Sequence, residues 1–307
     1  MNLPTLRQLH YLVTVVELCH FGQAAERCFV TQSTLSTAIQ ELESLLGVQL
    51  LERTKRKVIP TQLGMELADK ARQIISLTES LVLDAQVDRQ PLSGELRLGV
   101  IPTISPFLLP RVLPGVRGGF PELELYLLED QTQNLLGRLA AGELDCAILA
   151  LPFDLGGLEY RVFWQENFLV AFPAEHPLSR GGPIASQKLP GNELLLLEKG
   201  HCLRDHALAV CHMKAMAKRA TFQGTSLYTL VQMVAGGQGI TFLPEMAVDT
   251  DFLAQNPIAV RPLAEKGPHR EICLVWRASY HRKADLALLA ERMHGLLAAA
   301  CRPPDAG

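Results

Sequence analysis

Residues 20–64 read HFGQAAERCFVTQSTLSTAIQELESLLGVQLLERTKRKVIPTQLG and decide the fold of the first part of the chain. A short helix is expected over 22–27. Thr31 is a good N-cap for a further helix, which runs to Leu46 and stops at Gly47. Its apolar side can pack on a preceding helix over 5–18, where apolar residues also recur at helical spacing. Three short helices in this order fit a helix-turn-helix, and they also fit a small helical bundle.

The outer side of the helix over 31–46 is polar but uncharged. Amide and hydroxyl groups of this kind can read base edges in the major groove of DNA, and they equally suit a solvated surface. The candidate DNA-contacting residues at this helix are Gln32, Ser33, Thr34, Ser36, Thr37 and Gln40.

A basic run follows the helix and holds four Lys or Arg residues within residues 53–57. The next residues, Val58-Ile59-Pro60, can form the second strand of a β-hairpin. Such a wing would lie along the phosphate backbone, with Arg53, Lys55 and Arg56 as contacts. A charge run is more often only a solvated face, but its position directly after a helix-turn-helix favours the wing.

A long helix is expected over 61–89, with residues 67, 71, 74, 78, 81 and 85 at alternating spacings of four and three. This is a heptad seam, which needs a second helix to cover it, so we expect a dimer. Residues 91–94, PLSG, form a linker. The expected domains are therefore a winged helix-turn-helix over 1–60, a dimerisation helix over 61–91 and an effector domain over 92–300.

Strands and helices alternate through the remaining chain, which indicates an α/β fold with a parallel, doubly wound sheet. A second set of elements begins near Phe168, and the strand over 272–276 is expected to return to the first set. The effector domain should then have two lobes, lobe I over 92–165 and 268–300 and lobe II over 166–267. Ligands of such a domain bind at the carboxyl ends of its strands.

The stretch GHCLRDHALAVCH, residues 200–212, carries two cysteines with a histidine beside each. A helix beginning near Cys202 would place its thiol where the helix dipole favours an anion. Cys211 would then lie about 13.5 Å away at ~1.5 Å per residue. A disulfide requires Cα atoms within roughly 7 Å, so pairing these cysteines would melt the helix. Two ordinary buried cysteines remain the alternative at this point, and metal binding from both ends of one helix is geometrically unfavourable.

Composition restricts the function further. The chain has 307 residues, a net charge of −3 and seven cysteines without regular spacing. The beginning, MNLPTLRQLH, has no signal-peptide pattern, and no apolar run reaches the ~18 residues of a spanning helix. We therefore expect a cytoplasmic protein without membrane contact, in which a disulfide would be transient. No P-loop, GxGxxG, HExxH or GxSxG motif indicates an enzyme, a cofactor or a metal.

Three parts of the chain resemble the LysR-type transcriptional regulators. Residues 20–64 resemble the winged helix-turn-helix of that family, although Ser33 replaces the usual proline. The segments LSGELRLGVIPT, AGELDCAIL and FLVAFPAEHPL resemble its two-lobed, periplasmic-binding-protein-like effector domain. GHCLRDHALAVC resembles the redox segment of the peroxide-sensing members of the family.

The resemblance implies a regulator that senses hydrogen peroxide and controls oxidative-stress genes through a reversible disulfide. Cys202 would be the peroxidatic cysteine and Cys211 the resolving one. The residues implied for the peroxide pocket are Thr103, Thr132, His201, Arg204, Asp205 and Arg277. Thr221 and Tyr228 stand where relatives carry His and Glu, so no role is assigned to them.

The partners implied are double-stranded DNA with dyad-symmetric half-sites, a second copy in a homodimer or homotetramer, and RNA polymerase. Two other functions remain open. One is a LysR-type regulator that binds a small organic effector between the lobes, with structural cysteines only. The other is a thiol peroxidase, which would turn over with a reductant and would not need a DNA-binding head.

Overall fold

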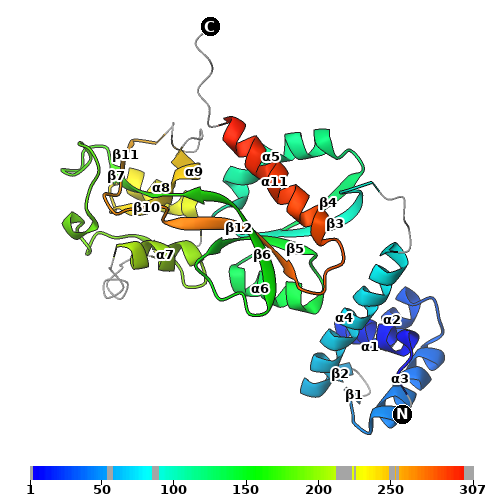
Figure 1. Ribbon diagram of the computed structural model, residues 1–307. Helices are drawn as coiled ribbons and strands as arrows, with labels where there is room; N and C mark the ends of the chain where they lie inside the picture. Colours follow the sequence, from blue (N-terminus) through cyan, green and yellow to red (C-terminus); the bar gives the residue numbers. More distant parts are fainter. Residues whose placement is uncertain are drawn as a thin grey trace. The chain divides into compact units, whose positions relative to one another are not determined.

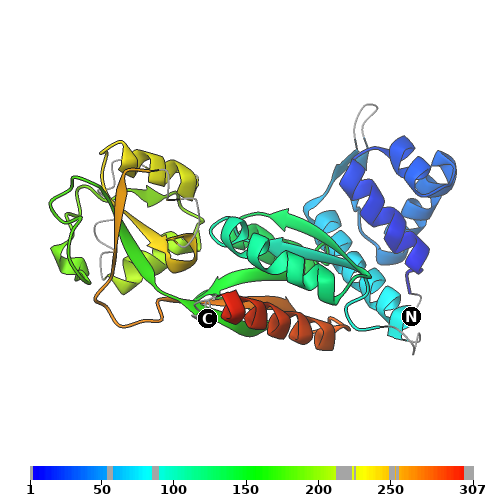
Figure 2. The same ribbon diagram turned by 90° about the horizontal axis from the view of Figure 1, so that it is seen from above.

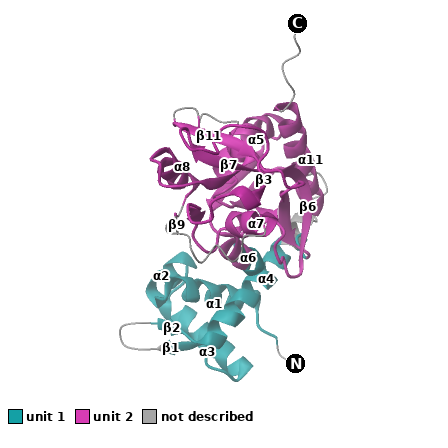
Figure 3. Ribbon diagram, turned by 90° about the vertical axis from the view of Figure 1, so that its left-hand side faces the viewer, with its two compact units in different colours: residues 1–89, 138–143, 279–281 teal, residues 90–137, 144–278, 282–307 magenta. Residues whose placement is uncertain are grey.

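The computed structural model describes residues 3–53, 58–84, 90–211, 223–224, 226–248, 253 and 256–300 (Figure 1). The chain divides into two compact units, one made chiefly of residues 1–89 and the other of most of residues 90–307 (Figure 3). No helix in the described ranges combines the length and apolar character needed to cross a bilayer.

The first unit contains the predicted three-helix head. Its helices are α1 (Leu6–Leu18), α2 (Phe21–Arg27) and α3 (Gln32–Leu46). The side chain of Thr31 accepts a hydrogen bond from the backbone N–H of Thr34, as an N-cap should. Gly47 ends α3 in the left-handed conformation. Buried residues from all three helices form one core, so local capping and tertiary packing define the same boundaries.

A two-stranded hairpin follows, in which β1 (Leu51–Arg53) pairs antiparallel with β2 (Val58–Pro60). The Glu43 carboxylate accepts hydrogen bonds from the backbone N–H groups of Leu50 and Leu51 and ties the hairpin to α3. The predicted wing is therefore present. Lys55 and Arg56, its expected phosphate contacts, lie outside the described residues.

The long helix α4 is described over Gln62–Asp84. Its first turn packs closely on the residue that precedes β1, because a Cβ at Gly64 would lie 2.1 Å from the carbonyl oxygen of Leu50. Of the predicted heptad seam, Ile74 and Leu81 are 46% and 70% exposed, whereas Leu67 packs against the core of the head and Ala71 is buried. Large apolar side chains in this position suit a helix that packs against a partner.

The second unit is built on a five-stranded sheet in the order β4-β3-β5-β12-β6 (Figures 1 and 2). The strands are β3 (Gly94–Val100), β4 (Leu123–Glu129), β5 (Cys146–Leu151), β6 (Leu158–Glu166) and β12 (Arg270–Arg277). Helix α5 (Ser105–Gly119) packs against α11 (Lys283–Ala300), and α6 (Thr132–Ala141) lies on the opposite side of the sheet in Figure 1. The chain crosses from β3 to β4 through α5 and then back from β4 to β5 through α6. These two crossovers run in opposite directions along the sheet. Since both are right-handed, their helices lie on opposite faces of it.

A second, smaller sheet has the order β10-β7-β11, and all its pairings are antiparallel. Its strands are β7 (Phe168–Pro173), β10 (Thr241–Pro244) and β11 (Ile258–Pro262). Beside it, β8 (Leu196–Leu197) pairs with β9 (Gln223–Gly224). The helices of this lobe are α7 (Cys202–Val210), α8 (Leu227–Ala235) and α9 (Glu245–Val248), with a short 3-10 turn over Ser186–Lys188.

The expected two-lobed α/β architecture is confirmed, but the sheets are not parallel throughout. In the large sheet only β3, β4 and β5 pair in parallel. The returning strand β12 is antiparallel to both β5 and β6. The reason is the path of the chain, which comes back from the second lobe and enters the large sheet from the opposite end.

Candidate functional site

The site is organised around Cys202, the first residue of α7. Gly200 has φ +106° just before it, and a Cβ there would lie 2.2 Å from Oε1 of Gln131. Only glycine combines this backbone conformation with such a close approach. The sequence therefore forces a sharp entry into α7, and the Cys202 side chain is left only 4% exposed.

Residues at the carboxyl end of the large sheet surround this thiol. Thr103 follows β3, and Thr132 begins α6 directly after β4. Arg270 is the first residue of β12 and lies at the same edge because β12 is antiparallel to β5. All three side chains are buried, as expected of a site at the carboxyl ends of parallel strands.

Arg270 is held by buried partners. Its guanidinium lies 2.6 Å from the Glu166 carboxylate, and both side chains are almost fully buried. It also donates to the Thr103 carbonyl at 3.2 Å and lies 3.4 Å from the Thr103 hydroxyl. This network fixes a positive charge beside the cysteine.

Burial raises the pKa of the Cys202 thiol above its ordinary value. Arg270, the Thr132 hydroxyl and backbone N–H groups at the start of α7 act in the other direction and favour the thiolate. Apart from this thiol, the buried Thr132 Oγ1 has no hydrogen-bond partner in the described part of the chain. A buried hydroxyl beside a thiol, with no other hydrogen-bond partner, can hold a small polar molecule there.

The other predicted pocket residues have different environments. His201 is buried, with Nε2 3.8 Å from Glu198, and burial lowers its pKa. Arg204 is buried and donates to the Leu197 carbonyl at 3.4 Å, whereas Asp205 is exposed. His201 and Arg204 are both buried, and of the two only His201 is next to Cys202 in the sequence.

The position predicted for Arg277 is corrected by the structure. Arg277 is the last residue of β12, so it lies at the opposite end of that strand from Arg270 and Cys202. It donates to the Leu144 carbonyl. Arg270 and its partner Glu166 lie at the Cys202 end instead, and neither was predicted from the sequence. The direction of β12 would have identified Arg270. Because β12 runs antiparallel to β5, its first residue lies at the carboxyl end of β5.

Cys211 lies at the other end of the same helix and caps it, with its N–H bonded to the Ala207 carbonyl. The thiol is buried and free, and its pKa is raised to about 12 by burial and by the nearby Glu265 carboxylate. Ser186 donates to the Cys211 carbonyl at 3.3 Å. Since the two cysteines are nine positions apart, their Cα atoms are separated by about 13.5 Å along the helix, too far for a disulfide.

On the head, α3 presents the predicted DNA-reading side chains. Gln32, Ser33, Thr34, Thr37 and Gln40 are exposed, and only Ser36 is partly buried. The backbone of Arg53 is placed in β1, while the rest of the basic run lies outside the described residues. The geometry of α3 is that of a helix able to enter a groove.

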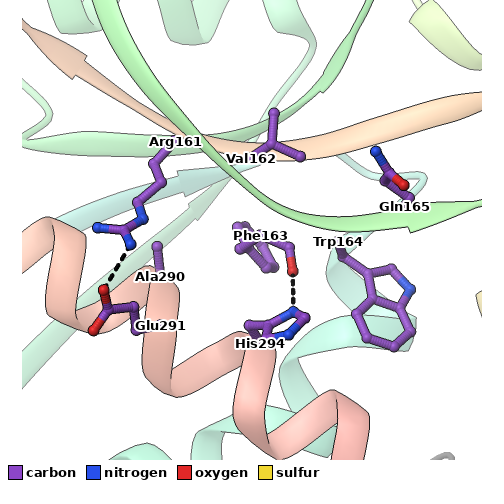
Figure 4. Close-up of a pocket in the computed structure, with 8 residues that line it drawn as sticks. All are labelled: Arg161, Val162, Phe163, Trp164, Gln165, Ala290, Glu291 and His294. Atoms are coloured by element: carbon purple, nitrogen blue, oxygen red, sulfur yellow. Dashed lines mark hydrogen bonds and ion pairs between the residues drawn. The ribbon is translucent and has the colours of Figure 1, made fainter.

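A separate cavity of about 610 Å³ lies between β6 and α11, away from Cys202 (Figure 4). Arg161 and Glu291 form a 2.6 Å ion pair at one end, and His294 Nδ1 lies 2.9 Å from the Phe163 carbonyl. None of the predicted site residues lines it.

Within the described residues, no group of three or more His, Cys, Asp or Glu could hold a metal ion. Of the two positions given no role, Tyr228 is exposed on α8, and Thr221 lies outside the described residues.

Comparison with known families identifies the class of protein. Residues 6–79 match the bacterial regulatory helix-turn-helix of the lysR family, and residues 89–298 match the LysR substrate binding domain. The chain therefore belongs to the LysR family of bacterial transcriptional regulators.

Within that family the chain is similar to OxyR. It is 41% identical over 286 residues to the DNA-binding transcriptional dual regulator OxyR of Escherichia coli K12, covering 93% of each chain. It is 42% identical to a hydrogen peroxide-inducible genes activator of Dickeya chrysanthemi, covering 89% of each. A full-length OxyR variant from Pseudomonas aeruginosa has TM-score 0.80 and 36% identity, covering 95% of this chain and 98% of that one.

Proposed function

We propose that this chain is a peroxide-sensing transcriptional regulator of the LysR type. Hydrogen peroxide oxidises Cys202, and a reversible Cys202–Cys211 disulfide converts that event into a change in the control of oxidative-stress genes. The similarity to peroxide-inducible activators supports the assignment of class. The assignment of the chemistry to particular residues rests on the buried Cys202 thiol, which lies beside Arg270 and the Thr132 hydroxyl. That hydroxyl has no other hydrogen-bond partner among the described residues.

The chemistry proceeds in two balanced steps. The Cys202 sulfur attacks one peroxide oxygen, the O–O bond breaks, and the products are a sulfenic acid and water. The Cys211 thiol then attacks the sulfenic sulfur, forming the disulfide and a second water. Arg270 stabilises the developing thiolate, and the Thr132 hydroxyl holds the peroxide. Thr103 keeps Arg270 in position.

The disulfide acts as a conformational switch because the helix cannot stand once it forms. Closing about 13.5 Å to within roughly 7 Å requires α7 to unwind. Leu203, Ala207 and Leu208 are buried in the reduced form and would be released. Burying one Leu contributes about 1.5–3 kcal/mol, so disulfide formation must offset several kcal/mol. The released segment can then repack against a neighbouring subunit.

The DNA-binding part of the proposal is a homodimer, assembling further to a homotetramer, on double-stranded DNA with dyad-symmetric half-sites. The seam on α4 supports the dimer, since Ile74 and Leu81 are exposed apolar residues on a long helix. The exposed polar face of α3 supports base reading. A regulator of this kind works in the cytoplasm and acts on RNA polymerase at promoters.

Mass spectrometry of the full-length protein after peroxide treatment tests the proposal, with Cys202→Ser and Cys211→Ser as variants. A Cys202–Cys211 disulfide should form in the wild type, Cys211→Ser should stop at the sulfenic acid, and Cys202→Ser should not react. If Cys202→Ser kept a full transcriptional response to peroxide, the redox assignment would be wrong. Sustained peroxide turnover with a thiol reductant would instead indicate a thiol peroxidase.

A further inference from the structure

One buried histidine near Cys202 has no part in the proposed function. His206 lies one turn further along α7 and is 4% exposed. Its Nε2 lies 2.8 Å from the Pro152 carbonyl oxygen, and its Nδ1 is buried without any hydrogen-bond partner among the described residues. A polar atom buried in this way needs an explanation.

The contact with Pro152 determines which nitrogen carries the proton. A carbonyl oxygen can only accept a hydrogen bond, so Nε2 must be the donor. In the neutral ring Nδ1 then carries a lone pair and can accept a proton. Protonating Nδ1 would place an N–H without a partner in a buried environment close to the Arg270 charge.

Helix geometry places the His206 side chain on the same face of α7 as Cys202. Residues i and i+4 share a helix face, with Cβ atoms about 5–6 Å apart. Side chains on a helix lean toward its N-terminus, so the His206 ring covers the turn that begins with Cys202. Arg270 acts electrostatically on both side chains, so both lie near the same guanidinium group.

We propose that His206 is the proton acceptor for the Cys202 thiol during reaction with peroxide, acting through one bridging oxygen atom. The inference rests on the proposed function, because it concerns the same reaction. The Sγ–H proton passes to Nδ1 as the sulfur attacks one peroxide oxygen and the O–O bond breaks. The hydroxide that leaves with the bonding electron pair then takes the proton back from Nδ1, giving the sulfenic acid, water and a neutral histidine.

A proton acceptor at His206 explains how the buried Cys202 thiol can lose its proton. Burial keeps Cys202 in its protonated form, and a thiol is a poor nucleophile until its proton leaves. Burial and Arg270 lower the pKa of His206, whereas the Pro152 hydrogen bond and Asp205 raise it. Glu166 neutralises much of the Arg270 charge. The net lowering keeps Nδ1 free at neutral pH, and the acceptor should fail only in acid.

Two substitutions separate proton transfer from anchoring. In His206→Gln the amide nitrogen can still donate to the Pro152 carbonyl, but no basic nitrogen remains. His206→Ala removes both functions. His294→Gln is the matched control, because His294 also bonds a backbone carbonyl but lies on α11, away from the cysteine.

The experiment measures the rate of Cys202 oxidation by hydrogen peroxide in the reduced full-length protein, between about pH 5 and 8. The wild-type rate should rise with pH through a step below the ordinary histidine value of 6.5, and His294→Gln should keep that profile. His206→Gln should react about 100-fold more slowly and lose the step. Circular dichroism of each variant checks that it folds.

Two results would overturn the inference. One is a wild-type rate and pH step in His206→Gln, since the histidine would then serve only as an anchor for α7. The other is a pH profile of the wild-type protein in which the oxidation rate shows no step in acid. This result does not depend on whether any variant folds. If the wild type did not oxidise Cys202 at all, the proposed function itself would fail.

Discussion

Replacing Arg270 by Met tests the electrostatic design of the site. The change keeps an unbranched side chain but removes the charge, leaving the Glu166 carboxylate buried without its cation. Glu166 would retain the backbone N–H of Met246 at 2.9 Å as a hydrogen-bond donor. Removing one partner of a buried ion pair costs about 3–5 kcal/mol, so the reduced protein should lose stability by that amount.

The loss can be measured by urea unfolding of the reduced protein. With a slope of about 3 kcal/mol/M, the midpoint should fall by about 1–1.7 M. Cys202 should also react more slowly with peroxide, because the pKa of its thiol rises further once Arg270 is gone.

The double variant Glu166→Gln with Arg270→Met separates the two effects. The amide introduced by Glu166→Gln carries no stranded charge, and its oxygen can still accept from the Met246 N–H. We expect most of the stability to return while Cys202 stays slow. If Arg270→Met unfolded at the wild-type urea concentration and reacted at the wild-type rate, the charge network would not control the thiol.

Four other outcomes are expected. Hydrogen exchange over 203–210 should be slow in the reduced protein and fast in the disulfide form; equal protection in both, with the disulfide verified, would exclude helix melting. Leu81→Asp should weaken binding to an operator with two half-sites, because a charge enters the seam at a residue that is 70% exposed and does not support the head; unchanged affinity would disprove the seam. Lys55→Gln should weaken binding to all DNA sequences and reduce the salt dependence, whereas a loss confined to one operator would refute a phosphate contact. The pKa of Cys211 and of Cys273 is raised to about 12, so the stability they contribute is complete below the unfolded value of 9.0 and is lost between pH 9 and about 12. A flat free energy of unfolding over that range would show that these thiols are not buried.

The local elements of the head could be predicted because their determinants lie within a few residues. Thr31 and Gly47 mark the ends of α3 by capping and by left-handed geometry, and the structure places the helix between them. The start of α7 at Cys202 follows in the same way from Gly200 and the apolar spacing after it. The separation of Cys202 from Cys211 then needs only the helical rise.

The surroundings of the thiol depend on strand direction, which a local pattern does not contain. Arg270 and Arg277 bracket one strand and look equally suitable in the sequence. The antiparallel entry of β12 places Arg270 beside the Cys202 thiol and Arg277 at the far edge. The pairing of Arg270 with Glu166 joins residues 104 positions apart, and the contact between His206 and the Pro152 carbonyl spans 54. Capping and periodicity act over a turn of helix, so the sequence alone determines where α7 begins and which thiols it carries. Charge, hydrogen bonding and solvent exclusion act through space, so only the tertiary structure decides which groups control those thiols.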